Sequence, residues 1–287
     1  MKASLFETIV EDIKKFRGLS RDCADFLLKK YPDILPNAIH GILSSEVQIR
    51  MKKYRYKLYG SRYDFLGQYK KAKQMNQPPG IIVRIAQQEN LSPAMVARII
   101  MEKYALAEDA NVTKADISKL LKDTSLIKNC DLAYEIYLAA LYDDRNGLIS
   151  DAFSTSIGYE YEIKLQLLLE QRNIAYQTED DLKSRGYDKT PDIKLEIPIA
   201  VDGFIINWIE SKARFGTPDI HNTHVDKQFL SYWNRFGPGL VIYWFGFVDE
   251  VVQLSEKKFI VLDHFPETIS YMDPTSIKIN SKPKINL

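Results

Sequence analysis

At 287 residues, with 45% hydrophobic and 27% charged side chains, the chain is long enough for two domains or three small ones, each with its own core. Its formal net charge of +1 does not exclude a nucleic-acid partner, because what matters is where the charges cluster. The two cysteines, Cys23 and Cys130, form no CxxC pair, which argues against a zinc knuckle or a disulfide framework. No apolar run reaches the ~18 residues of a membrane span, and the N-terminal stretch does not resemble a signal peptide. We therefore expect a soluble intracellular protein with no membrane partner.

The first 75 residues are predicted to form a helical unit. Apolar residues recur at helical spacing from Leu5 to Phe16. Ser20 is the expected N-cap of a second, short helix that Pro32 ends, and a longer helix begins near Pro36. Three successive helices, the last one basic towards its end, resemble a helix-turn-helix unit.

A second helical unit is predicted for residues 76–150. Its first helix ends at a tight break at Asn90-Leu91, after which Ser92 caps the next helix and Pro93 takes the first helical position. The pattern fits a helix-turn-helix that reads DNA, and it equally fits a plain helical hairpin. Further helices are expected in 114–151.

The stretch from Arg50 to Lys73 is strongly basic. It holds nine Lys or Arg, five tyrosines and a single acid, Asp64. Basic charge interleaved with aromatic rings suits a phosphate backbone with stackable bases, whereas a solvated helix face usually mixes both signs of charge. We therefore predict that this stretch binds nucleic acid and that salt weakens the binding. The contacting side chains are expected to be Lys52, Lys53, Arg55 and Lys57.

The remaining residues, 151–287, are predicted to form an α/β domain with a mixed central sheet. The order is α-β-β-β-α-β, and the apolar run 240–248 has the composition of a strand buried on both faces. An Asp202-Gly203 turn between two apolar runs is a strong hairpin signal. The fold class is thus a two-part α+β chain: an all-helical N-terminal half with helix-turn-helix-like units, then this domain. The expected elements are helices over 158–174 and 218–236 and strands over 174–178, 192–201, 204–213, 240–248 and 258–265.

Three charges stand at unusual places in the predicted hairpin. Glu210 and Lys212 share one face of their strand because side chains alternate, and the turn folds Asp192 back towards Glu210. Buried charges are costly unless they are paired or serve a function. Two carboxylates suit Mg²⁺, the ion promotes phosphodiester hydrolysis, and a lysine beside it stabilises developing negative charge. A structural ion-pair cluster is the alternative.

The same residues resemble a known nuclease signature. Pro191-Asp192 followed by Glu210-Ser211-Lys212 is similar to the PD-(D/E)xK motif, and the stretches GYDKTPD, WIESKARFG and SYWNRFGPGLVIYWFGF resemble the TPD-motif family of that superfamily. The resemblance extends weakly into the helical half. It implies a restriction-endonuclease-like nuclease domain over 151–287 in a nuclear, metal-dependent protein. In animals the family is linked to codanin, and through it to histone supply and red-cell development.

The resemblance also implies roles for individual residues. Asp192 and Glu210 correspond to the metal-binding acids, Lys212 to the catalytic lysine, and the Ser211 carbonyl to an additional metal ligand. The implied ion is Mg²⁺ or Mn²⁺.

Two further elements of the superfamily have counterparts here. It places a catalytic, metal-binding glutamate on its first helix, and we expect Glu162 rather than Glu160, although either one could simply be an acid favoured at a helix N-terminus. Gln228 and Tyr232 are four residues apart and resemble a QxxxY element that contacts nucleic acid. A polar rim contact is the alternative.

Other polar residues around the predicted site have weaker patterns. His221 and His224 are three apart and suit a metal, but such histidines are more often surface or phosphate contacts. Arg235 and Lys189 are candidates for phosphate contact. The residues expected to lie in the core are Trp233, Trp244 and Phe245.

The sequence leads to two functional hypotheses. The first is a nuclease that acts with a codanin-like partner, with DNA as the expected substrate and RNA left open. The second is an adaptor whose catalysis is dispensable and which stabilises that partner. The expected location is the nucleus, with the cytoplasm as a second compartment.

Overall fold

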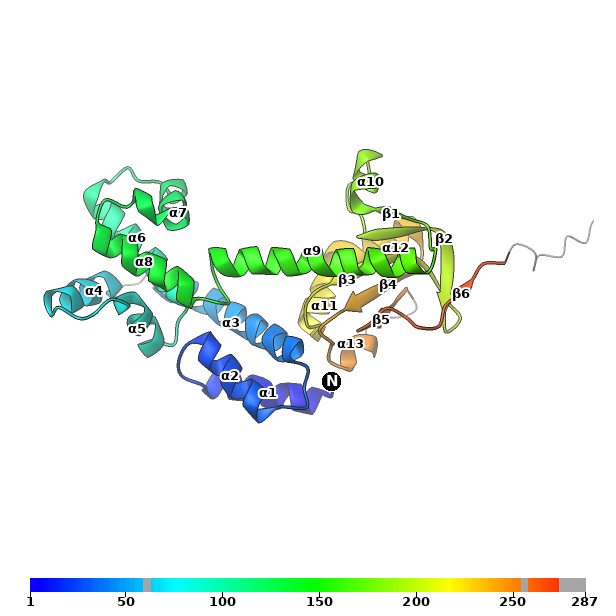
Figure 1. The fold of residues 1–287 in the computed structure, drawn as a ribbon, viewed down its shortest axis with the longest axis horizontal. Coiled ribbons are helices and arrows are strands. Elements are labelled where there is room, and N and C mark those ends of the chain that lie inside the picture. The colour runs from blue at the N-terminus through cyan, green and yellow to red at the C-terminus, as the bar shows by residue number, and fades with distance from the viewer. Residues whose placement is uncertain (59–62, 254–257, 274–287) are drawn as a thin grey trace, which may run out of the picture. The chain divides into compact units, whose positions relative to one another are not determined.

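The computed structural model describes residues 1–58, 63–253 and 258–273 (Figure 1). Its contacts divide the chain into two compact units, Met1–Tyr159 and Glu160–Leu287, and the division falls inside helix α9 (Leu148–Gln171). A third, separate domain ending near residue 75 stays a prediction. No helix among the described residues combines the length and the apolar character needed to cross a membrane.

The described residues of the first unit form helices and connecting loops without strands, as predicted. Helix α3 packs on α1 and α2, while α4, α5, α6 and α8 pack against one another. Helix α4, which precedes the predicted boundary at residue 75, thus packs with the helices that follow it. The helices are α1 (Ala3–Lys15), α2 (Ser20–Lys30), α3 (Pro36–Leu58), α4 (Phe65–Gln74), α5 (Ile81–Gln88), α6 (Pro93–Glu108), α7 (Lys114–Lys122), the 3₁₀ turn η1 (Thr124–Leu126) and α8 (Cys130–Tyr142).

One predicted helix start is confirmed, and another differs by one residue. Ser92 caps α6, because its Oγ accepts a hydrogen bond from Met95 N at 3.2 Å and Pro93 is the first helical residue. The prediction for Ser20 is wrong by one position: Ser20 is the first residue of α2, and its hydroxyl donates to the Asp144 carboxylate. A carboxylate from a distant segment is a stronger acceptor than the local backbone offers, so the hydroxyl makes a tertiary contact.

Two buried acids connect the helices of this unit. Glu135 on α8 accepts hydrogen bonds from the amides of Gly80, at 2.8 Å, and Ile82, at 3.1 Å, at the start of α5. Asp143 accepts from the amides of Ala94, at 3.0 Å, and Asn146, at 2.8 Å. Both carboxylates satisfy amides that a helix start or a turn leaves without partners.

The second unit is built on the mixed sheet that the sequence predicts. Its strand order is β1-β2-β3-β4-β5, with β6 paired to β2. Pairs β1/β2, β2/β3 and β2/β6 are antiparallel, and β3/β4 and β4/β5 are parallel. The strands are β1 (Tyr176–Thr178), β2 (Ile193–Val201), β3 (Phe204–Lys212), β4 (Gly239–Tyr243), β5 (Phe259–Leu262) and β6 (Ser270–Tyr271).

Helices cover both faces of the sheet. Leu165 and Leu169 of α9 pack with Ile193, Ile209 and Leu240 on one face. On the other face, Trp208 and Val241 pack with residues of a segment that runs through α11 (Pro218–His224), the π-helical turn η2 (Val225–Phe229) and α12 (Leu230–Phe236). The short helices α10 (Glu179–Ser184) and α13 (Glu250–Gln253) complete the unit.

The β2–β3 hairpin has the predicted turn. Asp202 and Gly203 adopt φ values of 49° and 80°, and Val201 pairs with Phe204 across them. Two successive left-handed residues are the signature of the tight turns that match strand twist, and glycine accepts this conformation without strain. At the other end of the hairpin, Ile193 pairs with Ile209, beyond a bulge in β2.

A candidate active site in the second unit

The hairpin brings Asp192 next to Glu210, as the sequence predicts. Asp192 directly precedes Ile193, which is paired with Ile209, so Asp192 lies opposite Glu210. Its Oδ2 accepts a hydrogen bond from Ser211 N at 2.7 Å, and its own amide donates to Glu210 Oε2 at 3.3 Å. The two acids therefore meet at the end of the hairpin away from its turn.

Lys212 completes this cluster. Its Nζ lies 2.5 Å from Glu210 Oε1, and Glu210 is only 2% exposed. Alternation along β3 places Ser211 on the opposite face, where its Oγ accepts from Trp244 Nε1 at 2.8 Å. The predicted convergence of two carboxylates and a lysine is thus present in the fold.

The environment of the two acids disfavours their ionised forms. Burial raises the pKa of Asp192 well above its ordinary value, and the nearby Glu210 adds to the shift. Burial also raises the pKa of Glu210, against the opposing effect of Lys212. Burial of Lys212 acts to lower its own pKa, but the two carboxylates outweigh that effect and the pKa is raised. The cluster accordingly combines a charged lysine with two carboxyl groups whose pKa values are raised.

Of the two glutamates considered on the first helix, Glu162 lies beside the cluster. It is half-buried, whereas Glu160 is exposed. Burial raises the pKa of Glu162, and the carboxylates of Glu179 and Glu210 add to the shift. The predicted role of Glu162 as a catalytic and metal-binding residue stays a prediction.

The predicted metal ligands fit a hard cation in their chemistry. Asp192 and Glu210 offer oxygens, and a cation between them would offset the burial that raises the pKa of both carboxyls and the repulsion by Glu210 that adds to the shift of Asp192. Within residues 1–58, 63–253 and 258–273, no three His, Cys, Asp or Glu side chains converge closely enough to hold an ion by themselves. A backbone oxygen such as the Ser211 carbonyl, or water, would have to complete the coordination.

Comparisons with known proteins place the chain in a family. Residues 128–265 match a family described as "Protein of unknown function TPD sequence-motif". A Xenopus tropicalis protein named "CDAN1-interacting nuclease 1" is 39% identical over 259 residues, or 87% of this chain and 84% of the relative. The chain belongs to the TPD-motif family.

Other relatives carry the same name. The protein from Danio rerio is 37% identical over 88% of this chain and 85% of its own length. The protein from Homo sapiens is 35% identical over 85% of this chain and 88% of its own length. No solved structure matches the chain.

The letters T-P-D occur twice in this member of the TPD-motif family, at Thr190-Pro191-Asp192 and at Thr217-Pro218-Asp219, and the first of them lies at the candidate site. Thr190 is buried, and its hydroxyl donates to Glu179 Oε1 at 3.3 Å. Glu179, in the first turn of α10, also influences the pKa values of Glu162 and Glu210. Glu179 is not predictable as a site residue from the sequence, because a helix with three acids in its first turn offers no signal that distinguishes one of them.

Arg235 supports the same loop from α12. Its guanidinium donates to the Lys189 carbonyl at 2.9 Å and to Asp188 Oδ1 at 2.8 Å. Arg235 thereby fixes the backbone just before Thr190, whereas its pattern in the sequence predicts a phosphate contact. Lys189 itself is exposed, as a phosphate contact requires.

The two residues of the QxxxY element have different surroundings: Gln228 lies near the site, and Tyr232 lies in the core. Gln228 is half-buried, and its Oε1 lies 3.2 Å from His224 Nδ1. Burial lowers the pKa of His224 to about 4, with Lys212 adding to the shift, so Gln228 lies near the cluster. Tyr232 is only 2% exposed and packs edge-on against Trp208. The structure therefore corrects the prediction for Tyr232, which is a core residue and does not offer its ring to nucleic acid.

The burial of His221 and of three aromatic residues differs from the prediction. His221 is fully buried, with its Nδ1 3.2 Å from the Tyr243 hydroxyl, so it is neither a surface group nor a phosphate contact. The three residues expected in the core are half-buried instead: Trp233, Trp244 and Phe245.

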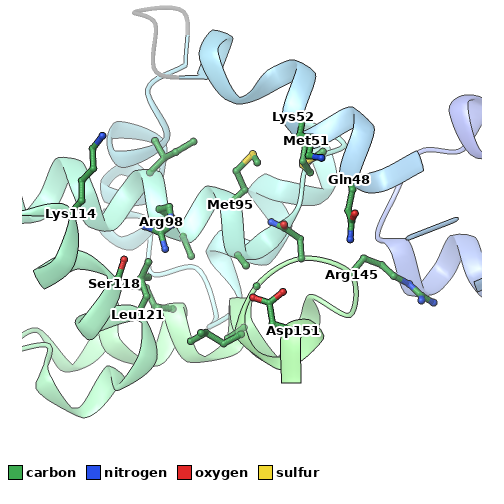
Figure 2. A pocket seen from close by; sticks show the side chains of 18 residues that line it. Gln48, Met51, Lys52, Met95, Arg98, Lys114, Ser118, Leu121, Arg145 and Asp151 are labelled. Atoms are coloured by element: carbon green, nitrogen blue, oxygen red, sulfur yellow. The ribbon is translucent and has the colours of Figure 1, made fainter. Parts of the chain in front are cut away.

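In the first unit, Lys52 lines a cavity of about 640 Å³ that is formed by α3, α6, α7, α8 and the start of α9 (Figure 2). Arg98 and Lys114 line the same cavity from two other helices, while Arg145 bonds to Ser44 at 3.1 Å and contacts His40. The cavity thus gathers cations from three helices. The contact of Lys52 with nucleic acid stays a prediction.

Of the other predicted contacts in the basic stretch, the structure describes the side chain of Lys53 alone. Lys53 is exposed on α3, one residue beyond Lys52. The side chains of Arg55 and Lys57 lie outside the described residues.

Proposed function

We propose that the chain is a metal-dependent nuclease of the PD-(D/E)xK type that hydrolyses phosphodiester bonds, with DNA as the expected substrate. The observation that carries the proposal is the cluster of Asp192, Glu210 and Lys212, in which the half-buried Asp192 meets the buried Glu210 and a lysine lies 2.5 Å from Glu210. The names of the relatives, which contain the word nuclease, support the same reaction class. We assign the activity to the nucleus, with the cytoplasm as a second compartment.

Asp192, Glu210 and the Ser211 carbonyl would hold Mg²⁺ or Mn²⁺, with Glu162 as a further acid beside them. When bound, such an ion stabilises negative charge on the phosphoryl oxygens and acidifies a water molecule. Asp192 is preset for this role, because the Ser211 amide fixes its Oδ2 at 2.7 Å. Orientation by an amide reduces the entropy that ligand binding would otherwise cost.

Lys212 contributes a fixed positive charge. The two carboxylates raise its pKa in spite of its burial, so its ammonium group stays protonated at neutral pH. A protonated lysine does not abstract a proton from water. Its role in the proposal is to stabilise the negative charge that grows on the phosphate oxygens in the transition state.

The test is cleavage of labelled single-stranded and duplex oligonucleotides by purified protein in Mg²⁺, in Mn²⁺ and in EDTA. We expect cleavage only with metal, and a loss of about 10²-fold or more in kcat for D192N, E210Q and K212M, the scale seen when one preorganised charge-stabilising group is removed. D202N is a matched control, since Asp202 is exposed in the turn at the far end of the same hairpin. Wild-type rates in D192N and E210Q, or equal cleavage in EDTA, would contradict the proposal.

A second candidate function is that of an adaptor that stabilises a codanin-like partner. The relatives are named as interacting with CDAN1, and α8 exposes an apolar stripe at helical spacing. Tyr134, Tyr137 and Leu141 in this stripe are 51%, 47% and 42% exposed. Co-purification with codanin separates the two candidates. If D192N and K212M bind and stabilise codanin as wild type does and support its cellular role, catalysis is dispensable for that role.

A further inference from the structure

Three aromatic side chains gather near the end of β3 that carries the candidate site. The Tyr161 ring lies 5.3 Å from the ring of Trp244 and 5.4 Å from that of Phe245, measured between centroids. Tyr161 belongs to α9, whereas Trp244 and Phe245 directly follow β4. We call these three residues the aromatic cluster.

Trp244 of the aromatic cluster is hydrogen-bonded to β3, the strand that carries Glu210 and Lys212. The Trp244 amide donates to the Lys212 carbonyl at 3.1 Å, and the Trp244 indole N–H donates to Ser211 Oγ at 2.8 Å. On α9, Tyr161 of the aromatic cluster immediately precedes Glu162, which interacts electrostatically with Glu210 and Lys212. The aromatic cluster thus lies on the α9 face of the sheet, whereas Glu210 and Lys212 point to the opposite face at the same end of β3. A nucleotide next to the bound phosphate would reach the aromatic cluster by passing over this strand end.

The three rings of the aromatic cluster are partly exposed to solvent. All three residues are half-buried, in contrast to Trp208 on the opposite face of the sheet, which is fully buried. The Lys164 ammonium lies 4.7 Å from the centroid of a Trp244 ring and 5.1 Å from that of Tyr161, and Lys164 is exposed. The exposed ammonium keeps its head group in water above these rings, and the half-buried rings keep part of their own surface exposed.

Half-exposed rings with a cation above them suit a nucleobase. A base offers a flat apolar face to the rings, and its phosphate offers a negative charge to Lys164. Stacking of this kind requires that the base be free of its neighbours, because both faces of a base inside a duplex are already covered. Of the ligands that approach a phosphodiester-cleaving site, an unpaired nucleotide uses every group of the cluster.

We propose that Tyr161, Trp244 and Phe245, with Lys164, form a stacking subsite for an unpaired nucleobase next to the cleaved phosphate. The inference rests on the proposed nuclease function and specifies its substrate class. That class is nucleic acid with an unpaired nucleotide at the cut: a single strand, a flap or a junction. A fully paired duplex lacks the group that the subsite binds.

The experiment combines deletion of a side chain with deletion of a base. After the cut is mapped on a labelled single strand, one tetrahydrofuran abasic nucleotide is placed in turn at each position around it. For wild type, one position next to the cut should lower kcat/KM about tenfold or more, the scale of one base–aromatic stack. Y161A should lose a similar factor on the intact strand and lose nothing more when the base at that position is absent.

Two variants control for folding and for general surface effects. Y161F keeps the ring and should behave as wild type. Y271A removes an exposed tyrosine on β6, which pairs with Ile199 and Ala200 of β2, towards the hairpin turn, and it should keep both the rate and the sensitivity to the abasic position. Independent losses in Y161A and in the abasic strand, which multiply when combined, would overturn the subsite.

The outcomes also separate this inference from the proposed function. Cleavage that requires Asp192 but is indifferent to base removal at every position overturns the subsite and leaves the nuclease in place. If no oligonucleotide is cleaved, the nuclease fails, and tryptophan fluorescence tests the subsite by itself. Quenching by oligothymidylate that is absent in W244F and absent with an abasic oligomer supports stacking; equal quenching in W244F overturns it.

Discussion

At the scale of single residues, His221 shows how burial sets the chemistry of a side chain. Its ring lies 5.9 Å from that of Phe229 and 5.8 Å from that of Phe259, and its Nδ1 is 3.2 Å from the Tyr243 hydroxyl. Burial lowers the pKa of His221 to about 4. The imidazole is therefore neutral in the folded protein at every pH at which the protein is expected to work.

This burial predicts a pH dependence of stability. An unfolded histidine titrates near 6.5, so between about pH 6.5 and pH 4 the unfolded chain binds a proton that the folded chain does not, and the free energy of unfolding falls as the pH falls. H221F keeps an aromatic ring but removes the proton site. Urea unfolding at pH 7 and pH 4.5 should show a loss that is smaller in H221F than in wild type by roughly 2 kcal/mol.

The surface residue His264 supplies the control, because it is exposed next to Asp263. H264F should retain the wild-type loss between the two pH values. A loss in H221F equal to that of wild type would show that folding does not lower the pKa of His221, contrary to its burial.

Residue-scale prediction succeeded where one rule of periodicity was enough. Alternation along a strand placed Glu210 and Lys212 together, and the hairpin turn brought Asp192 to them. It failed for Tyr232, because a four-residue spacing places two side chains on one helical face but does not say whether that face is buried. Tyr232 is 2% exposed and packs against Trp208 in the core.

At the scale of secondary-structure elements, the start of α6 depends on one buried carboxylate. Asp143 is 2% exposed and accepts from the amides of Ala94, at 3.0 Å, and Asn146, at 2.8 Å, and from the hydroxyl of Ser92. Burial raises its pKa while these hydrogen bonds oppose the shift. The residue joins the N-terminus of α6 to the segment after α8.

Truncation of Asp143 should therefore destabilise the first unit strongly. D143A leaves buried amides without acceptors, and we expect a loss of about 2–4 kcal/mol in the free energy of unfolding. D131A tests an aspartate at the start of α8 that is 67% exposed and paired with Lys73, and it should cost less than about 1 kcal/mol. Chemical denaturation followed by circular dichroism measures both; equal losses would contradict the role assigned to Asp143.

The elements themselves were predictable where their ends carry chemical signals. Ser92-Pro93 marked the start of α6, and Asp202-Gly203 marked the hairpin turn. Helix α9 begins before its predicted start at Gly158, which lies inside the helix with no neighbouring atom where its side chain would be. A helix interior tolerates such a glycine at a cost of roughly 1 kcal/mol, so the residue was a misleading boundary. Strand β6 has two residues and is too short for a detectable pattern.

At the scale of the whole molecule, the change in character between the two halves was visible in the sequence. Helical periodicity dominates the first half and alternation the second, and each unit has a core of its own. Leu27 on α2 and Leu240 on β4 are both fully buried in their respective units. The division inside α9 was not predictable, because a continuous helix has no linker that marks it.

Two units with separate cores should unfold in separate steps. Differential scanning calorimetry of the full chain is expected to resolve two transitions, because a single two-state transition requires one cooperative core. L27A creates a cavity in the first unit and L240A in the second, each at a cost of about 2–5 kcal/mol. Each variant should lower the Tm of one transition by on the order of 10 °C and leave the other in place. If both variants shift one common transition by similar amounts, the two units unfold as a single cooperative structure.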